Sequence, residues 1–246
     1  MQKRIAVCVL GRGIQRKSSD GPLRPTRIYD YWDITTPGAL RPEVLPKRVV
    51  GGPNWVIGGG EWNLGAAIEL YAELKPAITV FAYGNRSPYL TERGYPSESQ
   101  IMTDLFTDAV SARFEETPYT DIFNEAEWNA PGSGTFQEVR NMLVMGQREE
   151  CDEIVFLTVS VHMTRVAFFI SQHLREDGLA HLAPRVRLET SESVLLRCRP
   201  EYAVDIFEMF RSPEYSENLR REQNAIANFL AKGVTQTSNA LATAAK

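Results

Sequence analysis

Short apolar runs alternate with helical patterns along this chain, and this alternation constrains the fold more than any other feature. The runs at residues 5–10, 78–82 and 154–159 are rich in β-branched residues, as buried strands are. Helical spacing of apolar residues is seen at 62–74 and 163–174. Because strands that alternate with helices build βαβ units, the sequence predicts an α/β fold with a mainly parallel sheet.

Two patterns typical of helix starts predict further helices. Ser97-Glu98-Ser99-Gln100 fits a capping box that opens a helix to about Val110. Thr135-Phe136-Gln137-Glu138 fits a second one, which opens a helix to about Arg148. Shorter patterns predict strands at 186–188 and 194–197 and helices at 201–210 and 215–232. We expect a single domain over residues 1–232, followed by a flexible tail at 233–246.

The stretch 14–60 is rich in Pro, Gly, Arg and aromatic residues and has no sustained period. It is too long to be a simple connection, so we expect a functional insertion. Two interpretations stay open. The insertion is either a peripheral decoration with its own small core or a lid over a ligand, which would use Arg24, Arg27, Tyr29, Tyr31 and Trp32 to stack on and clamp a nucleotide-like group.

The composition argues against several classes of partner and location. The net charge of −4 over 246 residues provides no basic footprint, so we expect no binding to nucleic acid. The three cysteines are widely spaced, which predicts free thiols in a reducing compartment. The apolar run near the N-terminus is too short for a signal peptide or a membrane span. We therefore expect a cytoplasmic protein; its oligomeric state is left open.

The junction at residues 157–166 has the strongest functional signal. An apolar strand passes directly into a helix that begins with His162 and Arg165, three residues apart on one helix face. Ligands of open α/β sheets bind at the carboxyl ends of the strands, which is where these side chains are expected. The structural alternative is that His162 caps the helix and Arg165 pairs with a nearby carboxylate.

We expect the polar residues at three predicted helix starts to lie close together at the carboxyl edge of the sheet. Helix N-termini present unpaired amides and a positive dipole end, which suit phosphate or carboxylate, and an arginine adds a bidentate clamp. Glu98 as a simple dipole partner and Thr135 as a simple cap are the structural alternatives. We expect one crevice lined by Gly11, Glu98, Thr135, His162 and Arg165.

The glycine motifs favour neither common nucleotide loop. Gly11-Arg12-Gly13 lacks the third glycine of a dinucleotide fingerprint, which argues against NAD binding. Gly58-Gly59-Gly60 lacks the Lys-Ser/Thr of a P-loop, so a flexible turn is expected there.

The order of these motifs resembles that of the YdcF/SanA/ElyC family of bacterial proteins. The corresponding pieces are Leu10-Gly11-Arg12-Gly13, Ala67-Ile68-Glu69-Leu70-Tyr71, Ser97-Glu98-Ser99, Gly134-Thr135-Phe136-Gln137-Glu138 and Leu157-Thr158-Val159-Ser160-Val161-His162-Met163-Thr164-Arg165-Val166. The resemblance covers about residues 5 to 175 and implies a Rossmann-like, three-layer αβα domain. Some family members are linked to cell-envelope metabolism. SanA-like and ElyC-like members have membrane anchors, whereas this chain resembles the soluble YdcF-like members.

The chain departs from the family pattern at several positions. Asn63 stands where the family has a helix arginine, and Gly134 and Glu138 replace its two asparagines. The family's upstream glutamate corresponds to Glu127 or, less well, to Glu125. These changes leave the expected fold unaltered and put the family ligand in doubt.

The motifs together predict a small-molecule enzyme, a hydrolase or transferase, that acts on a phosphorylated or nucleotide-like anionic ligand. His162 would be the general acid/base, since an unperturbed imidazole titrates near neutral pH. Glu98 or Glu127 would orient it or, with Glu138, hold Mg²⁺. The expected ligand-binding residues are Gly11, Gly13, Ser97, Thr135, Glu138, Thr158 and Arg165.

Two other hypotheses stay open. In one, the same crevice belongs to a non-catalytic protein that binds a nucleotide or S-adenosylmethionine. In the other, the chain is an interaction protein that uses the aromatic segment 29–32; this explains the insertion but not the three polar helix starts.

Overall fold

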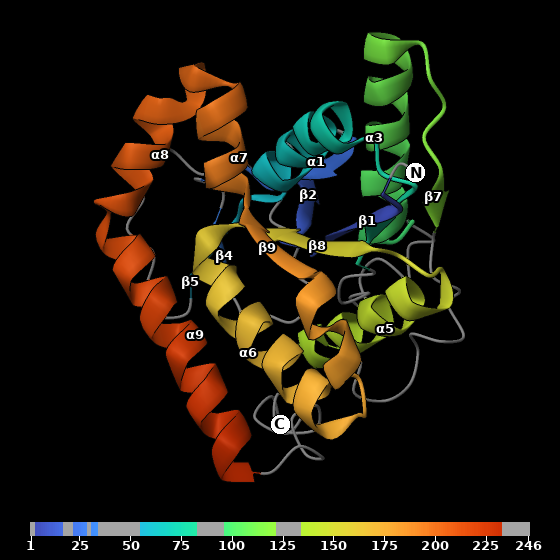
Figure 1. The fold of residues 1–246 in the computed structure, drawn as a ribbon. Helices are drawn as coiled ribbons and strands as arrows, with labels where there is room; N and C mark the ends of the chain where they lie inside the picture. Colours follow the sequence, from blue (N-terminus) through green and yellow to red (C-terminus); the bar gives the residue numbers. More distant parts are fainter. Residues whose placement is uncertain are drawn as a thin grey trace.

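The computed structural model describes residues 3–16, 22–28, 31–33, 55–82, 96–121 and 134–232. Within this part of the chain, five strands form one sheet whose neighbouring strands all pair in parallel (Figure 1). Across the sheet they are β7 (Thr120–Asp121), β6 (Ile78–Phe81), β1 (Ile5–Val9), β8 (Glu153–Thr158) and β9 (Val186–Thr190). The predicted α/β class and parallel sheet are confirmed.

Helices cover both faces of the sheet and make three layers (Figure 1). One face packs against α1 (Gly60–Leu74), α3 (Glu98–Phe114) and α7 (Ser191–Cys198). The other face packs against α5 (Thr135–Arg148) and α6 (Ser160–Glu176). The long helix α9 (Pro213–Lys232) lies along α6. This is the Rossmann-like three-layer arrangement.

The central strand β1 explains why the sequence pattern was informative. Val7 and Val9 point into the core beneath α1 and α3, whereas Ala6 and Cys8 point into the core above α5 and α6. A strand covered on both faces needs apolar residues at every position, which produces a continuous apolar run.

One predicted strand is wrong. Residues 194–197 belong to α7, whose N-cap Thr190 accepts a hydrogen bond from the Ser193 amide at 3.2 Å. Val194 and Leu195 are buried in the core beside α1, so the apolar residues expected in a strand are buried by helix packing instead. A short apolar run fits a buried helix as well as a strand, and here the cap determines the outcome. The remaining short helices are η1 (Ala180–Arg185), η2 (Pro200–Tyr202) and α8 (Ala203–Phe210).

The two predicted capping boxes have different outcomes. Ser97 is the N-cap of α3 and accepts a hydrogen bond from the Gln100 amide at 3.2 Å, as expected. Thr135 is not a cap, because Gly134 occupies the N-cap position of α5 and Thr135 is already helical. The helix was predicted correctly, but its cap lies one residue earlier and provides no side-chain hydrogen bond.

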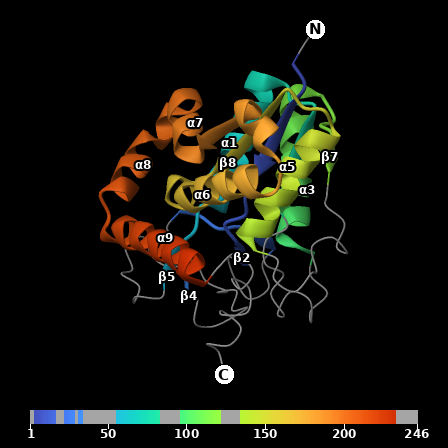
Figure 2. The ribbon, with the colours of Figure 1, turned by 60° about the horizontal axis from the view of Figure 1, so that its bottom comes forward.

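The described parts of the insertion form two antiparallel strand pairs. β2 (Ile14–Arg16) pairs with β3 (Leu23–Pro25), and β4 (Tyr31–Asp33) pairs with β5 (Trp55–Ile57). Figure 2 shows β4 and β5 beside α9, and the Asn218 side chain of α9 accepts a hydrogen bond from the Ile57 amide at 3.1 Å. Tyr29 and the tail at 233–246 lie outside the described residues.

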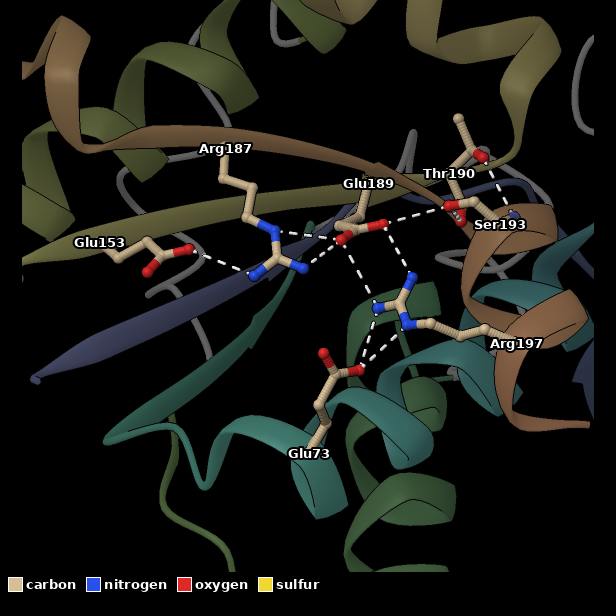
Figure 3. Close-up of polar contacts among 7 residues, drawn as sticks. All are labelled: Glu73, Glu153, Arg187, Glu189, Thr190, Ser193 and Arg197. Carbon is tan, nitrogen blue, oxygen red and sulfur yellow. Dashed lines mark hydrogen bonds and ion pairs between the residues drawn. The ribbon is translucent and has the colours of Figure 1, made fainter.

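An ion-pair network fastens the β9 edge of the sheet (Figure 3). Arg187 contacts Glu153 of β8 at 3.4 Å and also pairs with Glu189. Arg197 of α7 lies 3.4 Å from Glu189 and 2.9 Å from Glu73 of α1. Charged side chains on an edge strand discourage pairing with another chain, so this network has a structural role.

All three cysteines are free thiols, as predicted. Burial raises the pKa of the Cys8, Cys151 and Cys198 thiols. Within the described part of the chain, no helix combines the length and the apolar character that crossing a membrane requires.

Two helical glycines provide a test of the packing. A Cβ on Gly146 of α5 would lie 2.3 Å from Cδ1 of the buried Ile154, whereas one on Gly65 of α1 would meet nothing closer than Leu195 Cδ2 at 3.6 Å. Gly146→Ala is therefore expected to lower the free energy of unfolding by about 1–2 kcal/mol through overpacking. Gly65→Ala should raise it by about 0.5–1 kcal/mol. Urea denaturation measures both, and stabilisation by both substitutions would contradict this packing.

Candidate functional site

The loop after β1 closes around the carboxylate of Glu98. Glu98 Oε1 accepts hydrogen bonds from the backbone amides of Arg12 at 2.8 Å and Gly13 at 2.7 Å. Burial raises the pKa of this carboxyl group, while the two amides and the Arg12 charge act in the opposite direction. A Cβ on Gly11 would lie 2.8 Å from the same oxygen, so the loop approaches too closely for any other residue. Glu98 thus fixes the loop at the carboxyl edge, where the parallel strands end.

The side chain of Arg12 links this loop to the insertion and to α9. It is buried and donates to the carbonyl oxygens of Ile57 and, at 3.5 Å, of Gly58. Its Nη1 lies 3.9 Å from Oε1 of Glu222. Burial lowers the pKa of Arg12, and the charge of Glu222 opposes that shift.

Glu222 is the carboxylate beside His162 and Arg165. Its Oε1 lies 3.4 Å from His162 Nδ1, and its Oε2 lies 2.9 Å from Arg165 Nε. The latter contact is an ion pair without hydrogen-bond geometry, so both Oε2 and Nε lack a hydrogen bond. Arg165 Nη2 also lies 3.2 Å from His162 Nδ1. His162 is only 3% exposed, whereas the Arg165 side chain is 28% exposed.

The protonation states in this cluster differ from those expected. Burial lowers the pKa of His162 to about 4, and the neighbouring Glu222 only partly offsets this. Burial alone would raise the pKa of Glu222, but His162, Arg165 and Arg12 lower it to about 2. At neutral pH His162 is therefore a neutral imidazole beside an ionised carboxylate, and the expectation of an unperturbed imidazole is wrong.

This lowered pKa predicts a pH dependence of stability. The imidazole pKa is about 6.5 when unfolded and about 4 when folded, so the unfolded chain binds the extra proton between these values. The contribution of neutral His162 is fully present above about pH 6.5 and is lost as the pH falls toward 4, a change of about 3 kcal/mol. His162→Gln should abolish this part of the pH dependence in urea denaturation series. Identical pH profiles for the two proteins would contradict the buried neutral imidazole.

A second buried carboxylate caps the histidine helix. Both oxygens of Glu192 accept from the Ser160 amide, at 3.0 and 2.8 Å, and Oε1 also accepts from Ser160 Oγ at 2.8 Å. The N-cap residue of α6 is Val159, so His162 does not cap its own helix. Tyr215 of α9 lies 3.1 Å from Ser160 Oγ. Burial raises the pKa of Glu192.

Asn63 joins three strand ends at this edge. Its Nδ2 donates to the Leu10 carbonyl at 2.7 Å and lies 3.4 Å from Thr158 Oγ1, and its Oδ1 accepts from Ser191 Oγ at 2.6 Å. The position of the family arginine is therefore filled by a buried amide. Thr158 is also buried, which makes its role at this edge structural.

The predicted site residues fall into two groups on opposite sides of the sheet, so the structure does not bring Glu98 and His162 together as the expected single crevice requires. Gly11, Gly13, Ser97 and Glu98 lie around the start of α3, and His162 and Arg165 lie on α6. Arg12 and Glu222 connect the two groups at the carboxyl edge. Glu98 therefore does not orient His162, because its carboxylate is engaged by the β1 loop; Glu222 contacts the histidine instead.

The remaining predicted residues lie at the start of α5 or beyond the described residues. Thr135 is partly exposed and Glu138 is buried in the first turn of α5. Since α5 leads into a strand of the parallel sheet, its first turn also lies at the carboxyl edge. Glu125 and Glu127 lie outside the described residues. Where the structure describes side chains, no group of three or more His, Cys, Asp or Glu residues could hold a metal ion.

An open hollow of about 280 Å³ lies at the opposite, amino edge, lined by Lys3, Arg4, Lys75 and Ala77. Its cations already have carboxylate partners: Lys3 with Glu153 at 3.7 Å, Arg4 with Glu149 at 3.1 Å and Lys75 with Glu116 at 2.9 Å. We therefore assign the site to the carboxyl edge, where two guanidinium groups share one carboxylate.

The comparisons with known proteins add no further constraint: no protein-family model, no curated protein and no solved structure matches the chain.

Four site residues were not identified from the sequence. Arg12 lies between Gly11 and Gly13, and Glu192 follows the Thr190 cap, so both have a local signal in the sequence. Asn63 was noted only as a departure from the family pattern. Glu222 had no local signal, because its role depends on how α9 lies against α6.

Proposed function

We propose that this protein is a small-molecule enzyme of the hydrolase or transferase type that binds a phosphorylated or nucleotide-like ligand at the carboxyl edge of the sheet. The supporting observation is the buried cluster of Arg12, His162, Arg165 and Glu222. Burying charged side chains costs desolvation free energy, whereas well-packed apolar residues at the same positions would not have this cost. A cluster of perturbed titratable groups at this edge of an α/β sheet is typical of functional sites.

The proposed roles follow from exposure and charge. The Arg165 side chain is 28% exposed, and it would bind the anionic group of the ligand. The start of α5 lacks a side-chain cap, so its first amides would contribute to the same anion site. His162, being neutral, would accept a proton from the attacking group. Mg²⁺ and S-adenosylmethionine remain proposals for the ligand screen.

The resemblance to the YdcF/SanA/ElyC family supports a ligand site at the same edge of the sheet, since the motif with His162 and Arg165 is the most specific part of that resemblance. We also propose a cytoplasmic location, for which the three free cysteines are the supporting observation.

A thermal-shift screen tests the ligand class. Nucleotides, sugar phosphates and S-adenosylmethionine are each added with and without Mg²⁺, because a ligand that binds only the folded state raises its melting temperature. We expect a phosphorylated compound to raise the melting temperature and Arg165→Met to abolish the rise. Arg220→Met, an exposed arginine paired with Glu217 on α9, is the matched control. No rise with any phosphorylated compound, or one that Arg165→Met leaves intact, would contradict the proposal.

The low pKa of His162 favours one alternative, a non-catalytic nucleotide- or S-adenosylmethionine-binding protein. The two functions differ in what happens without the imidazole, since a binder retains its ligand whereas an acid/base catalyst loses turnover. The compound with the largest thermal shift is followed by ³¹P NMR with wild type and His162→Gln. Slow conversion by wild type that His162→Gln abolishes supports the enzyme; binding without conversion by either protein supports the alternative.

A further inference from the structure

Two neighbours of His162 Nδ1 make opposite demands on that atom. Glu222 Oε1, 3.4 Å away, is an acceptor and bonds to Nδ1 only when Nδ1 has a proton. Arg165 Nη2, 3.2 Å away, is a donor and bonds to Nδ1 only when Nδ1 has a free lone pair. Because the imidazole is neutral, one ring nitrogen has the proton and the other does not. The two contacts therefore correspond to two different tautomers.

The geometry favours the contact with Arg165. That contact is the shorter of the two, and Oε1 of Glu222 also faces Nη1 of Arg12. Nε of the same arginine lies 2.9 Å from Oε2 of Glu222, so each carboxylate oxygen already has a guanidinium group beside it. Nδ1 then accepts from Arg165, and the proton resides on Nε2. Among the described residues, none forms a hydrogen bond with Nε2.

We propose that Arg165 and Glu222 are positioning residues that select the tautomer of His162, and that an anionic ligand switches it. When a phosphoryl group engages Arg165, the guanidinium leaves Nδ1. Nδ1 then takes a proton from solvent, keeps it and donates a hydrogen bond to Oε1 of Glu222, while Nε2 releases its proton to solvent. No net charge changes, and Nε2 now offers a lone pair.

The consequence is a general base that forms only with the anion in place. This inference rests on the proposed function, because the anion that moves Arg165 is the proposed ligand. The arrangement follows a general rule for histidine, in which the hydrogen bond made by one ring nitrogen determines what the other can do.

Nitrogen-15 NMR of the histidine rings tests the first half without any ligand. At pH 7, resonances missing from His162→Gln identify His162, and the chemical shifts of its two nitrogens identify the protonated one. We expect Nε2–H in wild type and in Glu222→Gln, and Nδ1–H in Arg165→Met. Arg220→Met is the matched control and should leave the wild-type pattern. A proton on Nδ1 in the wild-type protein would overturn the inference, even if no variant folded. A proton on Nε2 in Arg165→Met would overturn it as well.

Titration with inorganic phosphate, or with the best compound of the thermal-shift screen, tests the second half. We expect the Arg165 Nε signal to shift and the His162 tautomer to change from Nε2–H to Nδ1–H at the same ligand concentration. A shifted Arg165 signal with an unchanged tautomer overturns this inference and leaves the proposed function intact. The third outcome is a protein whose His162 tautomer changes with Arg165→Met but which binds no anion. This result overturns the proposed function together with the ligand-driven half of the inference.

Discussion

Glu222→Ala is expected to lower the free energy of unfolding by about 3–5 kcal/mol, because it leaves two arginines without the carboxylate they share. Arg12 is buried, so losing the Glu222 carboxylate removes one of the negative charges that stabilise its guanidinium away from water. His162 and Arg165 would lose the same partner. Urea denaturation with wild type and variant measures the loss directly.

The same helix offers a matched control for this substitution. Glu217 is also a glutamate of α9 and also contacts two arginines, Arg220 and Arg221, but its side chain is 33% exposed, against 10% for Glu222. Exposed ion pairs contribute little, so Glu217→Ala should cost far less than Glu222→Ala. Equal losses for the two variants would mean that the buried cluster does not exist as described.

Gly11→Ala is expected to cost about 2–4 kcal/mol, because the new methyl group would occupy the place of the Glu98 carboxylate. A Cβ there would lie 2.8 Å from Oε1 and 3.0 Å from Cδ of Glu98. The displaced carboxylate would lose its hydrogen bonds from the Arg12 and Gly13 amides, and hydrogen bonds to charged groups contribute about 1.5–3 kcal/mol each.

A double-mutant cycle separates this clash from backbone strain. Glu98→Ala removes the carboxylate and its two hydrogen bonds, so the extra methyl group at position 11 then has room. We expect Gly11→Ala to cost much less in the Glu98→Ala background than in wild type, with a coupling above about 1 kcal/mol. Additive losses from the two substitutions would show that the carboxylate does not contact the loop.

The sheet could be predicted from the sequence because its central strands are buried on both faces. The expected strands at 5–10, 78–82 and 154–159 agree with β1, β6 and β8 to within one residue at each end. The error at 194–197 arose because α7 is short and its apolar residues, Val194 to Leu196, form a continuous run in the middle of the helix. Its cap residue, Thr190, was also the last residue of the preceding strand.

The site could be predicted only in part, because its residues come from distant elements. The strand-to-helix junction indicated His162 and Arg165 from local sequence alone. Their carboxylate partner comes from a helix 60 residues further along the chain, and nothing in the local sequence indicates that α9 packs against α6. The neutral state of His162 likewise follows from its burial, which depends on tertiary packing.

The most direct test of the central claim is a crystal structure with the compound that gives the largest thermal shift. We expect its anionic group at the carboxyl edge, hydrogen-bonded to Arg165 and close to the first turn of α5. An anion bound instead in the hollow at the amino edge, on Lys3, Arg4 and Lys75, would contradict the assignment of the site.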